Sequence, residues 1–189
     1  DYDVVVKPYA SALNFKDIMV NLDIVSENYI GYEACGIVLE SNTDKFKKGD
    51  DVIVLKKHGK CISNLIHCKE DEIFKKPNNL SYIEASSICL IFCTVYICLI
   101  ERANIKKDDF VLIHSATGGV GQAAIQICNM LGAKIITTAG TEEKRKKLRE
   151  EFNIEYISDS RNPDIFKKDI LNFTNNEGVD VILNSLSDK

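Results

Sequence analysis

The chain has 189 residues, of which 45% are hydrophobic and 28% are charged, the usual mixture of a globular protein. This composition excludes disorder as the main state of the chain. The 24 lysines and arginines against 28 acidic residues give a net charge of −4, and the basic residues are scattered, so we expect no nucleic-acid partner. The uncharged stretch Ala85–Ile100 is shorter than the roughly 20 residues of a spanning helix. We predict a buried helix there and no membrane association.

No basic segment followed by an apolar core opens the sequence, so we expect no signal for secretion. We therefore expect a cytoplasmic protein. The seven cysteines include no C-x-x-C pair, so neither a metal knuckle nor a redox motif is predicted. A strand pattern is already present at Tyr2–Val6, and no helix or cap closes the strand pattern at Val179–Leu183. We expect a fragment or a shortened relative of a longer protein.

Up to about residue 80 the chain alternates short β-rich runs with turn signals. The runs are Val4–Val6, Ala34–Leu39 and Asp51–Leu55, and the turns include Lys48–Asp50 and Pro77–Asn79. Few helical periods interrupt them. Residues 1–80 are therefore predicted to form a small, mostly β module.

Beyond residue 80, apolar runs alternate with helical patterns, which predicts an α/β domain over residues 81–189. The predicted strands are Phe110–His114, Lys134–Ala139, Ile154–Ile157 and Val179–Leu183, and the predicted helices between them are Val120–Leu131, Glu142–Phe152 and Asp164–Phe173. Strands joined by helices in this way lie parallel in one sheet. The predicted fold class is α/β, with a mostly β module followed by a partial, doubly wound parallel sheet.

The candidate site is the turn between the first of these strands and its helix. The turn has the form Ser115-x-x-Gly118-x-x-Gly121, a departure from the common dinucleotide fingerprint G-x-G-x-x-G. A strand, a glycine turn and a helix N-terminus together present unpaired backbone N–H groups to a pyrophosphate. We predict a dinucleotide site there rather than an ordinary turn. We also expect a side chain added at Gly119 to fill the pyrophosphate space.

The cofactor preference is predicted from the end of the second strand, Thr137–Thr141. NAD-binding proteins place an acid there that bonds the adenosine ribose, and this segment has none. Thr141 and Lys144 could instead hold a 2′-phosphate. Lys144 could equally belong to the solvated face of a charged helix. Both interpretations stay open on spacing alone.

Five motifs occur in an order and at spacings that resemble one known superfamily. They are Leu13–Asp17 (LNFKD), Gly31–Gly36 (GYEACG), Lys48–Val52 (KGDDV), the Ser115–Gly121 turn and Leu183–Leu186 (LNSL). Together they resemble the medium-chain dehydrogenase/reductase superfamily. The resemblance is greatest to the enoyl reductase domain of type I polyketide and fatty-acid synthases, a zinc-free branch similar to quinone oxidoreductases. It covers almost the whole chain.

The resemblance implies a fold, a cofactor and a reaction. A GroES-like substrate-side module would occupy residues 1–80, incomplete at its N-terminus. An NADP-binding Rossmann domain would occupy residues 81–189, incomplete at its C-terminus. NADPH would reduce the 2,3 double bond of a carrier-bound 2-enoyl thioester. The partners would be an acyl carrier and, in a multidomain chain, the other synthase domains.

The resemblance also implies roles for single residues. The pyrophosphate would lie on the turn and helix start, at Gly118, Gly119, Val120 and Gly121. The 2′-phosphate would face Thr141, Lys144 and Arg161, near the ends of the next two strands. The nicotinamide would be bordered by Asn14, Asn184 and Thr94. Many synthase reductases carry a Tyr where Val25 stands. That Tyr is one proposed proton donor, and a second donor, a Lys and Asp pair, follows the LNSL motif in the family. Neither is present in these residues, so no proton donor is identified.

Zinc-dependent members of the superfamily bind their catalytic metal with a Cys in the first motif and a His in the second. Asn14 and Tyr32 stand at those places, so we predict no metal. Two alternatives to the synthase reductase stay open. One is a stand-alone NADPH quinone oxidoreductase. The other is a catalytically incomplete nucleotide-binding module, because we do not expect residues 1–189 alone to be fully active.

Overall fold

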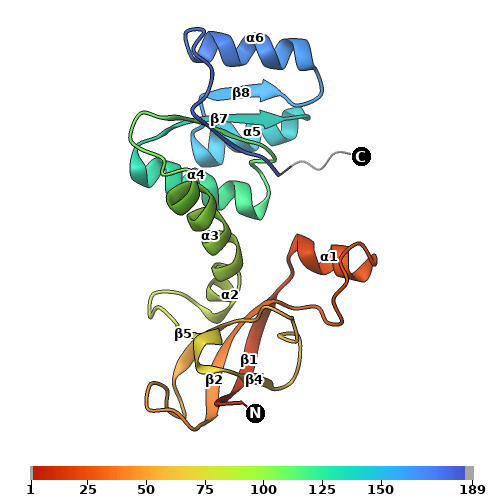
Figure 1. Ribbon diagram of the computed structural model, residues 1–189, viewed down its shortest axis with the longest axis vertical. Helices are drawn as coiled ribbons and strands as arrows, with labels where there is room; N and C mark the ends of the chain where they lie inside the picture. The colour runs from red at the N-terminus through yellow and green to blue at the C-terminus, as the bar shows by residue number, and fades with distance from the viewer. Residues whose placement is uncertain (1, 186–189) are drawn as a thin grey trace. The chain divides into compact units, whose positions relative to one another are not determined.

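The computed structural model describes residues 2–185, so Leu186, the last residue of the LNSL motif, lies outside the described range. The chain folds into two compact units, residues 1–90 and 91–189 (Figure 1). The predicted α/β class, a mostly β part followed by a parallel sheet with helices, is confirmed. The assignment of residues 1–80 and 81–189 to two family domains stays a prediction.

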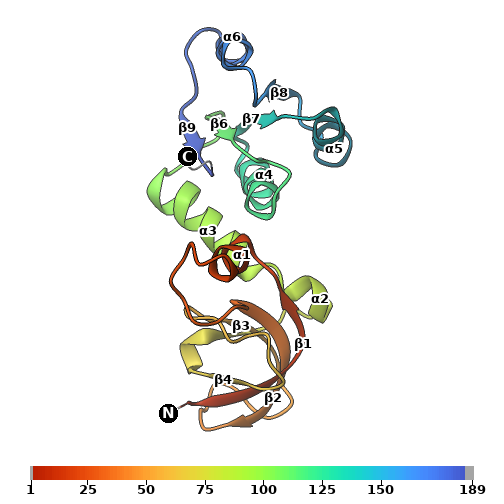
Figure 2. The ribbon, with the colours of Figure 1, turned by 90° about the vertical axis from the view of Figure 1, so that its right-hand side faces the viewer.

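The first unit is built on one antiparallel sheet with the strand order β4-β1-β2-β3-β5 (Figure 2). The strands are β1 (Val4–Ala12), β2 (Glu33–Ser41), β3 (Asp51–Leu55), β4 (Ile66–Cys68) and β5 (Ile73–Lys75), and the 3-10 helix η1 (Glu70–Glu72) joins the last two. The pairing of β1 with β2 contains two register shifts, which bend the sheet. Its core consists of buried aliphatic side chains, Phe46 and two cysteines, Cys61 and Cys68.

Helix α1 (Phe15–Asn21) was missed by the sequence analysis. Asn14 is its N-cap, and the carboxylate of Asp17 accepts a hydrogen bond from the Asn14 backbone N–H at 2.7 Å. The other oxygen of Asp17 accepts from the N–H of Gly31 at 2.5 Å. Gly31 has φ +79°, a conformation that favours glycine. One buried carboxylate therefore fixes both the start of α1 and the chain that enters β2.

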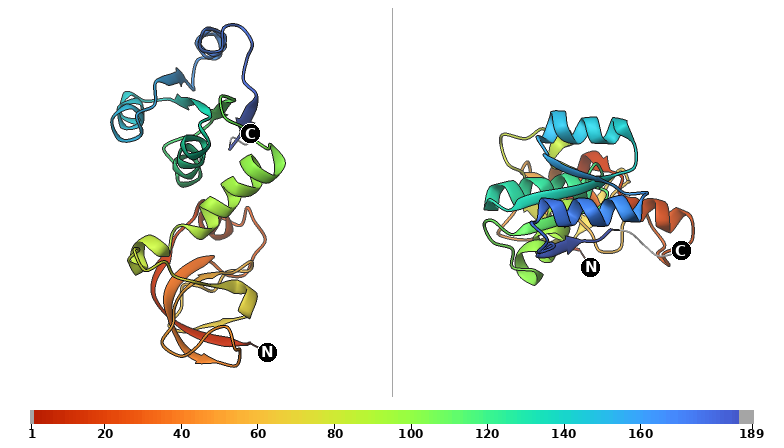
Figure 3. Two further views of the ribbon diagram at one scale, coloured as in Figure 1. Left: turned by 90° about the vertical axis from the view of Figure 1, so that its left-hand side faces the viewer. Right: turned by 90° about the horizontal axis from the view of Figure 1, so that it is seen from above.

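The prediction of one buried helix over Ala85–Ile100 is wrong. The segment contains α2 (Tyr82–Ala85), α3 (Cys89–Val95) and a π-helical run η2 (Tyr96–Arg102), the last two continuous in Figure 3. Between α2 and α3, the hydroxyls of Ser86 and Ser87 donate to backbone carbonyls three residues earlier. Such bonds compete with helical hydrogen bonds. Tyr96 and Ile97 are about half exposed. Within residues 2–185, no helix is long and apolar enough to cross a membrane.

The second unit is a parallel sheet with the strand order β8-β7-β6-β9. The elements in chain order are β6 (Phe110–Ile113), α4 (Gly119–Leu131), β7 (Lys134–Ala139), α5 (Glu142–Phe152), β8 (Tyr156–Asp159), α6 (Pro163–Phe173) and β9 (Val181–Leu183). Helices α4 and α5 cover one face and α6 covers the other (Figures 1 and 2). Because β6 pairs with both β7 and β9, the order of winding reverses at β6. Sheets of this kind bind ligands at such a point.

Gly121 lies in the first turn of α4, where the helix contacts the loop before it. A Cβ atom at Gly121 would lie 2.5 Å from the Cα atom of Ala116, a distance that real Cβ contacts do not show. Gly119 differs, because a Cβ atom there would meet only the side chain of Ile91, at 3.3 Å. Gly121 is therefore required by the close approach of two backbones, whereas Gly119 is not.

We predict that Gly121→Ala destabilises the second unit by about 1–3 kcal/mol, because the added methyl group forces the helix away from Ala116. The matched control is Gly119→Ala, which adds the same group in the same helical turn against a movable side chain. It should change stability by less than about 1 kcal/mol, since alanine favours the helix. Denaturant unfolding of both variants measures the difference. Equal losses would contradict the close contact.

Candidate functional site

A pocket of about 280 Å³ lies at the carboxyl ends of β6 and β7. Its walls come from the end of β7, the first turn of α5 and the connections that follow β6, β7 and β8: Ser115, Thr117, Gly118, Thr138, Ala139, Gly140, Lys144 and Ser160. Parallel strands end at one edge of a sheet, which explains why residues so far apart in the sequence meet there. The pocket is the place where the sequence predicts a dinucleotide.

The turn after β6 prepares one wall of this pocket. Ser115 has φ +52°, the left-handed conformation that glycine usually supplies, and its carbonyl accepts a hydrogen bond from the N–H of Gly118 at 2.9 Å. Gly118 is the N-cap of α4 and has no side chain to cap it. The N–H groups at the start of α4 therefore have no side-chain cap, which is the arrangement that binds phosphates.

We expected a side chain added at Gly119 to fill the pyrophosphate space, and the structure corrects this expectation. A Cβ atom there would face Ile91 of α3, and Gly119 is not among the residues that line the pocket. Gly118 does line it, and a Cβ atom at Gly118 would meet only the carbonyl oxygen of Ser115, at 3.3 Å. Gly118 is therefore the position at which an added side chain meets the pocket.

Two cations lie beside the end of β7. Lys144 lines the pocket, and the Nε atom of Arg161 would lie 2.8 Å from a Cβ atom at Gly140, so the missing side chain makes room for the arginine. Within residues 2–185, neither cation pairs with a carboxylate. The nearby acid Asp159 is already used: it pairs with Arg145 at 3.1 Å and accepts the Arg161 backbone N–H at 2.8 Å. Two positive side chains therefore stay available for an anion.

The other predicted residues of this unit occupy different places. The Thr141 hydroxyl accepts the N–H of Lys144 at 3.4 Å and caps α5. Val120 and Gly121 belong to the first turn of α4. Thr94 lies in α3 and Asn184 follows β9, and neither lines the described pocket. The structure therefore brings Gly118, Lys144 and Arg161 together at one edge of the sheet.

His114 holds the lining residue Thr138 in place. Its Nδ1 atom lies 3.1 Å from the Thr138 hydroxyl, and its ring lies 6.1 Å from that of Phe166. Burial lowers the pKa of His114, which favours the neutral form of the ring. The sequence analysis missed Thr138, Thr117 and Ser160. The signal that could have found them is their position at the end of a predicted parallel strand (Thr138) or in the turn that follows one (Thr117 and Ser160).

In the first unit, Asn14 contacts a buried acid that the sequence analysis also missed. Its Nδ2 atom donates to Glu33 Oε1 at 3.0 Å, and the backbone N–H of Leu90 donates to Glu33 Oε2 at 2.9 Å. Burial raises the pKa of Glu33, while these donors act in the opposite direction. The neighbouring Tyr32 is 1% exposed, and no described residue reaches its hydroxyl with a hydrogen bond.

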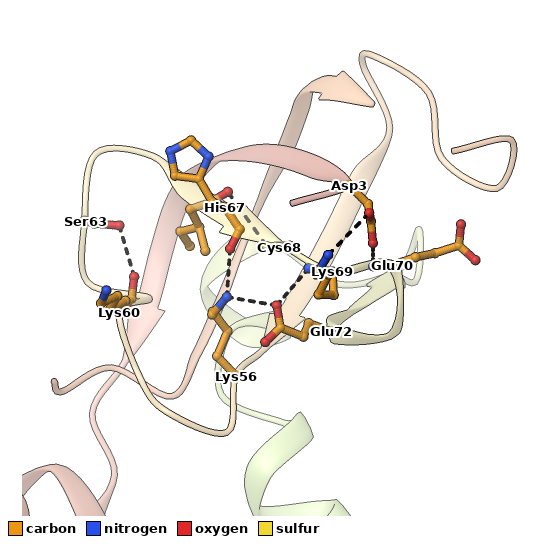
Figure 4. Close-up of polar contacts among 10 residues, drawn as sticks. Asp3, Lys56, Lys60, Ser63, His67, Cys68, Lys69, Glu70 and Glu72 are labelled. Atoms are coloured by element: carbon orange, nitrogen blue, oxygen red, sulfur yellow. Dashed lines mark hydrogen bonds and ion pairs between the residues drawn. The ribbon is translucent and has the colours of Figure 1, made fainter. Parts of the chain in front are cut away.

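A larger cavity of about 500 Å³ lies in the first unit, beside β4. Its cation Lys56 donates to the carbonyl of His67 at 2.7 Å and to the carboxylate of Glu72 at 2.8 Å (Figure 4). A second cation, Lys60, lies 4.0 Å from the ring centroid of Tyr29. The charged groups of this cavity are therefore engaged with groups of the unit itself.

Two family comparisons cover most of the chain. Residues 1–79 match the alcohol dehydrogenase GroES-like domain, and residues 119–189 match the zinc-binding dehydrogenase family. The chain is 38% identical over 197 residues to the reducing polyketide synthase hmp8 of Hypomyces subiculosus and 38% identical over 190 residues to a highly reducing polyketide synthase of Didymella fabae. It is covered to 99% in both cases but spans only 8% and 10% of those proteins.

Solved structures agree with these relatives. CurK enoyl reductase is 32% identical, with a TM-score of 0.88, over 99% of this chain and 60% of that chain. A quinone oxidoreductase from Pseudomonas syringae pv. Tomato DC3000 is 26% identical, with a TM-score of 0.86, over 96% and 57%. The chain thus spans about three fifths of the solved reductases. Because the family matches, the relatives and the fold agree, the chain belongs to the medium-chain dehydrogenase/reductase superfamily, and it is similar to segments of polyketide synthases and to enoyl reductases.

Proposed function

We propose that the chain is the NADPH-dependent enoyl reductase unit of a polyketide or fatty-acid synthase. It would reduce the 2,3 double bond of a carrier-bound 2-enoyl thioester in the cytoplasm, with the other synthase domains as partners. The observation that carries the cofactor choice is the pair Lys144 and Arg161, which lie beside the pocket without a carboxylate partner among the described residues. The similarity to solved enoyl reductases supports the reaction.

The residues of the chain would divide the work of binding the cofactor. NADPH, when bound, supplies the hydride that reduces the double bond. The uncapped start of α4, residues 118–121, would bind the pyrophosphate. Lys144, Arg161 and the capping hydroxyl of Thr141 would face the 2′-phosphate, because charge-assisted hydrogen bonds to phosphate are the strong ones. Thr94, Asn184 and Asn14 would border the nicotinamide.

The zinc-binding dehydrogenase family, which matches part of the chain, is named for a metal that the residues around Asn14 and Tyr32 do not fit. A zinc site needs several thiolate, imidazole or carboxylate donors gathered around one point. Here the amide nitrogen of Asn14 is bonded to Glu33, both oxygens of Glu33 accept N–H groups, and the phenol of Tyr32 is buried. Within the described range, no three His, Cys, Asp or Glu residues gather as a metal site would require. We therefore propose hydride transfer without a metal.

A quinone oxidoreductase is the second candidate, and the similarity to the enzyme of Pseudomonas syringae favours it. Both candidates need the same nucleotide pocket. They differ in the acceptor of the hydride, so only the substrate separates them.

We predict that Arg161→Ala weakens NADPH binding by about 1.5–3 kcal/mol and leaves NADH binding nearly unchanged, because a charge-assisted contact to the 2′-phosphate is lost. The matched control is Lys168→Ala, which removes one exposed positive charge from α6. It should affect neither cofactor. Titration of the full-length protein with both cofactors measures the four affinities. Equal losses of NADPH and NADH in the Arg161 variant would contradict the assignment.

We predict that the full-length protein with NADPH turns over a crotonyl thioester and not a simple quinone. Loss of the near-ultraviolet absorbance of NADPH measures both reactions. Faster quinone reduction would favour the second candidate. Tight NADPH binding with turnover of neither substrate would favour a nucleotide-binding module without catalysis.

We predict that removal of metal with a chelator changes neither cofactor binding nor turnover, because the donors around Asn14 and Tyr32 do not fit zinc. Elemental analysis of the metal-washed protein, followed by assay with and without added zinc, tests this. Stoichiometric zinc, or activity that returns only with zinc, would overturn the metal-free proposal.

A further inference from the structure

The carboxylate of Glu33 has no part in the nucleotide pocket, yet it is fully buried, at 0% exposure. It accepts from the side-chain amide of Asn14 on one oxygen and from the backbone N–H of Leu90 on the other, at 3.0 and 2.9 Å. The backbone of Cys89 contributes a further hydrogen bond. Three donors therefore meet one carboxyl group, and two of them belong to the backbone at the start of α3.

An ionised carboxylate only accepts hydrogen bonds, so it decides which end of an amide can face it. The backbone donors of Cys89 and Leu90 cannot reverse their polarity. Glu33 must therefore present acceptors to them, and its remaining lone pairs face Asn14. The amide of Asn14 consequently turns its nitrogen toward Glu33, and its carbonyl oxygen lies at the opposite end.

Asn14 is held at its backbone as well. Its own N–H donates to Asp17 at 2.7 Å, and Asp17 is in turn held by the N–H of Gly31. Asp17 is 3% exposed, whereas Asn14 is only half-buried. Two buried carboxylates thus restrain the backbone and the side chain of one residue that is still open to a ligand.

We propose that Glu33 is a positioning residue that orients the Asn14 amide, so that Asn14 offers a bound cofactor or substrate a hydrogen-bond acceptor. That Asn14 binds a cofactor or substrate rests on the proposed function, whereas the Glu33–Asn14 contact does not. An oxygen anion formed during reduction needs a hydrogen-bond donor. Asn14 held in this way is therefore not the donor for an enolate oxygen, and it binds an N–H or O–H group of the ligand instead.

The test exchanges the polarity of the two side chains. In Glu33→Gln the amide oxygen must serve the backbone donors, so the amide nitrogen faces Asn14, and the Asn14 amide has to flip. In Asn14→Asp two carboxylates face each other at a buried contact. In the double variant, which combines both exchanges, the introduced glutamine donates to the introduced aspartate, and an acceptor oxygen again faces the ligand. Glu40→Gln, an exposed acid on the same strand, is the matched control.

We expect Asn14→Asp to raise the unfolding equilibrium constant of the full-length protein by about ten- to a hundredfold, because two carboxylates then face each other at a buried contact. Glu33→Gln should raise it less, because the flipped Asn14 amide restores the hydrogen bond. The double variant should unfold with a constant far below the product of the two single effects, because the hydrogen bond is restored. Glu40→Gln should stay within about threefold of the wild type. Single effects that simply multiply would overturn the Glu33–Asn14 contact.

Ligand binding tests the positioning role separately. Glu33→Gln should weaken binding of NADPH or of a crotonyl thioester about tenfold, since a donor then faces a donor, and the double variant should recover to within about threefold. Coupling in stability together with unchanged binding in Glu33→Gln would overturn the positioning role. Wild-type protein that binds neither ligand would overturn the proposed function and the ligand half of this inference, whereas the stability measurements still decide the contact.

Discussion

The nucleotide pocket depends on how closely helix α4 approaches the turn before it. Gly121 lies so near the backbone of Ala116 that no side chain fits between them. Ser115, in a left-handed conformation, bends the chain between the strand and the helix. These two local features place the uncapped start of α4 at the carboxyl edge of the sheet, beside the ends of β6 and β7. Every other wall of the pocket is supplied by connections at that same edge.

The parallel sheet could be predicted from the sequence because buried parallel strands are continuous apolar runs and surface helices are amphipathic. The predicted Lys134–Ala139 and Glu142–Phe152 coincide with β7 and α5. Helix α1 was missed because so short a helix shows no clear hydrophobic periodicity. The buried carboxylate of Asp17 stabilises its first turn instead. The helix predicted over Ala85–Ile100 failed for a similar local reason, because the hydroxyls of Ser86 and Ser87, between α2 and α3, donate to backbone carbonyls of α2.

Some residues of the candidate site could likewise be predicted from the sequence, and others could not. Gly118 and Lys144 could be predicted because each follows a strand end in the sequence, and the resemblance to synthase reductases supplied Arg161. Glu33 could not be predicted, since its partners are 19 and 57 residues away and belong to the starts of two different helices. A residue pattern shows that a Glu is present. It does not show that backbone donors from a distant segment bury the carboxylate and set its polarity.

The charge around the pocket follows from how the acids of α5 and β8 are used. A chain of net charge −4 would be expected to repel a phosphate. However, Asp159 pairs with Arg145, and Glu142 is shared by Arg145 and Arg149, which lower the pKa of its carboxyl group. Arginines therefore pair with Glu142 and Asp159, two of the acids near the end of β7. Lys144 and Arg161 are not used in these pairs, so two cations lie beside the pocket in an acidic protein without any basic stripe in its sequence.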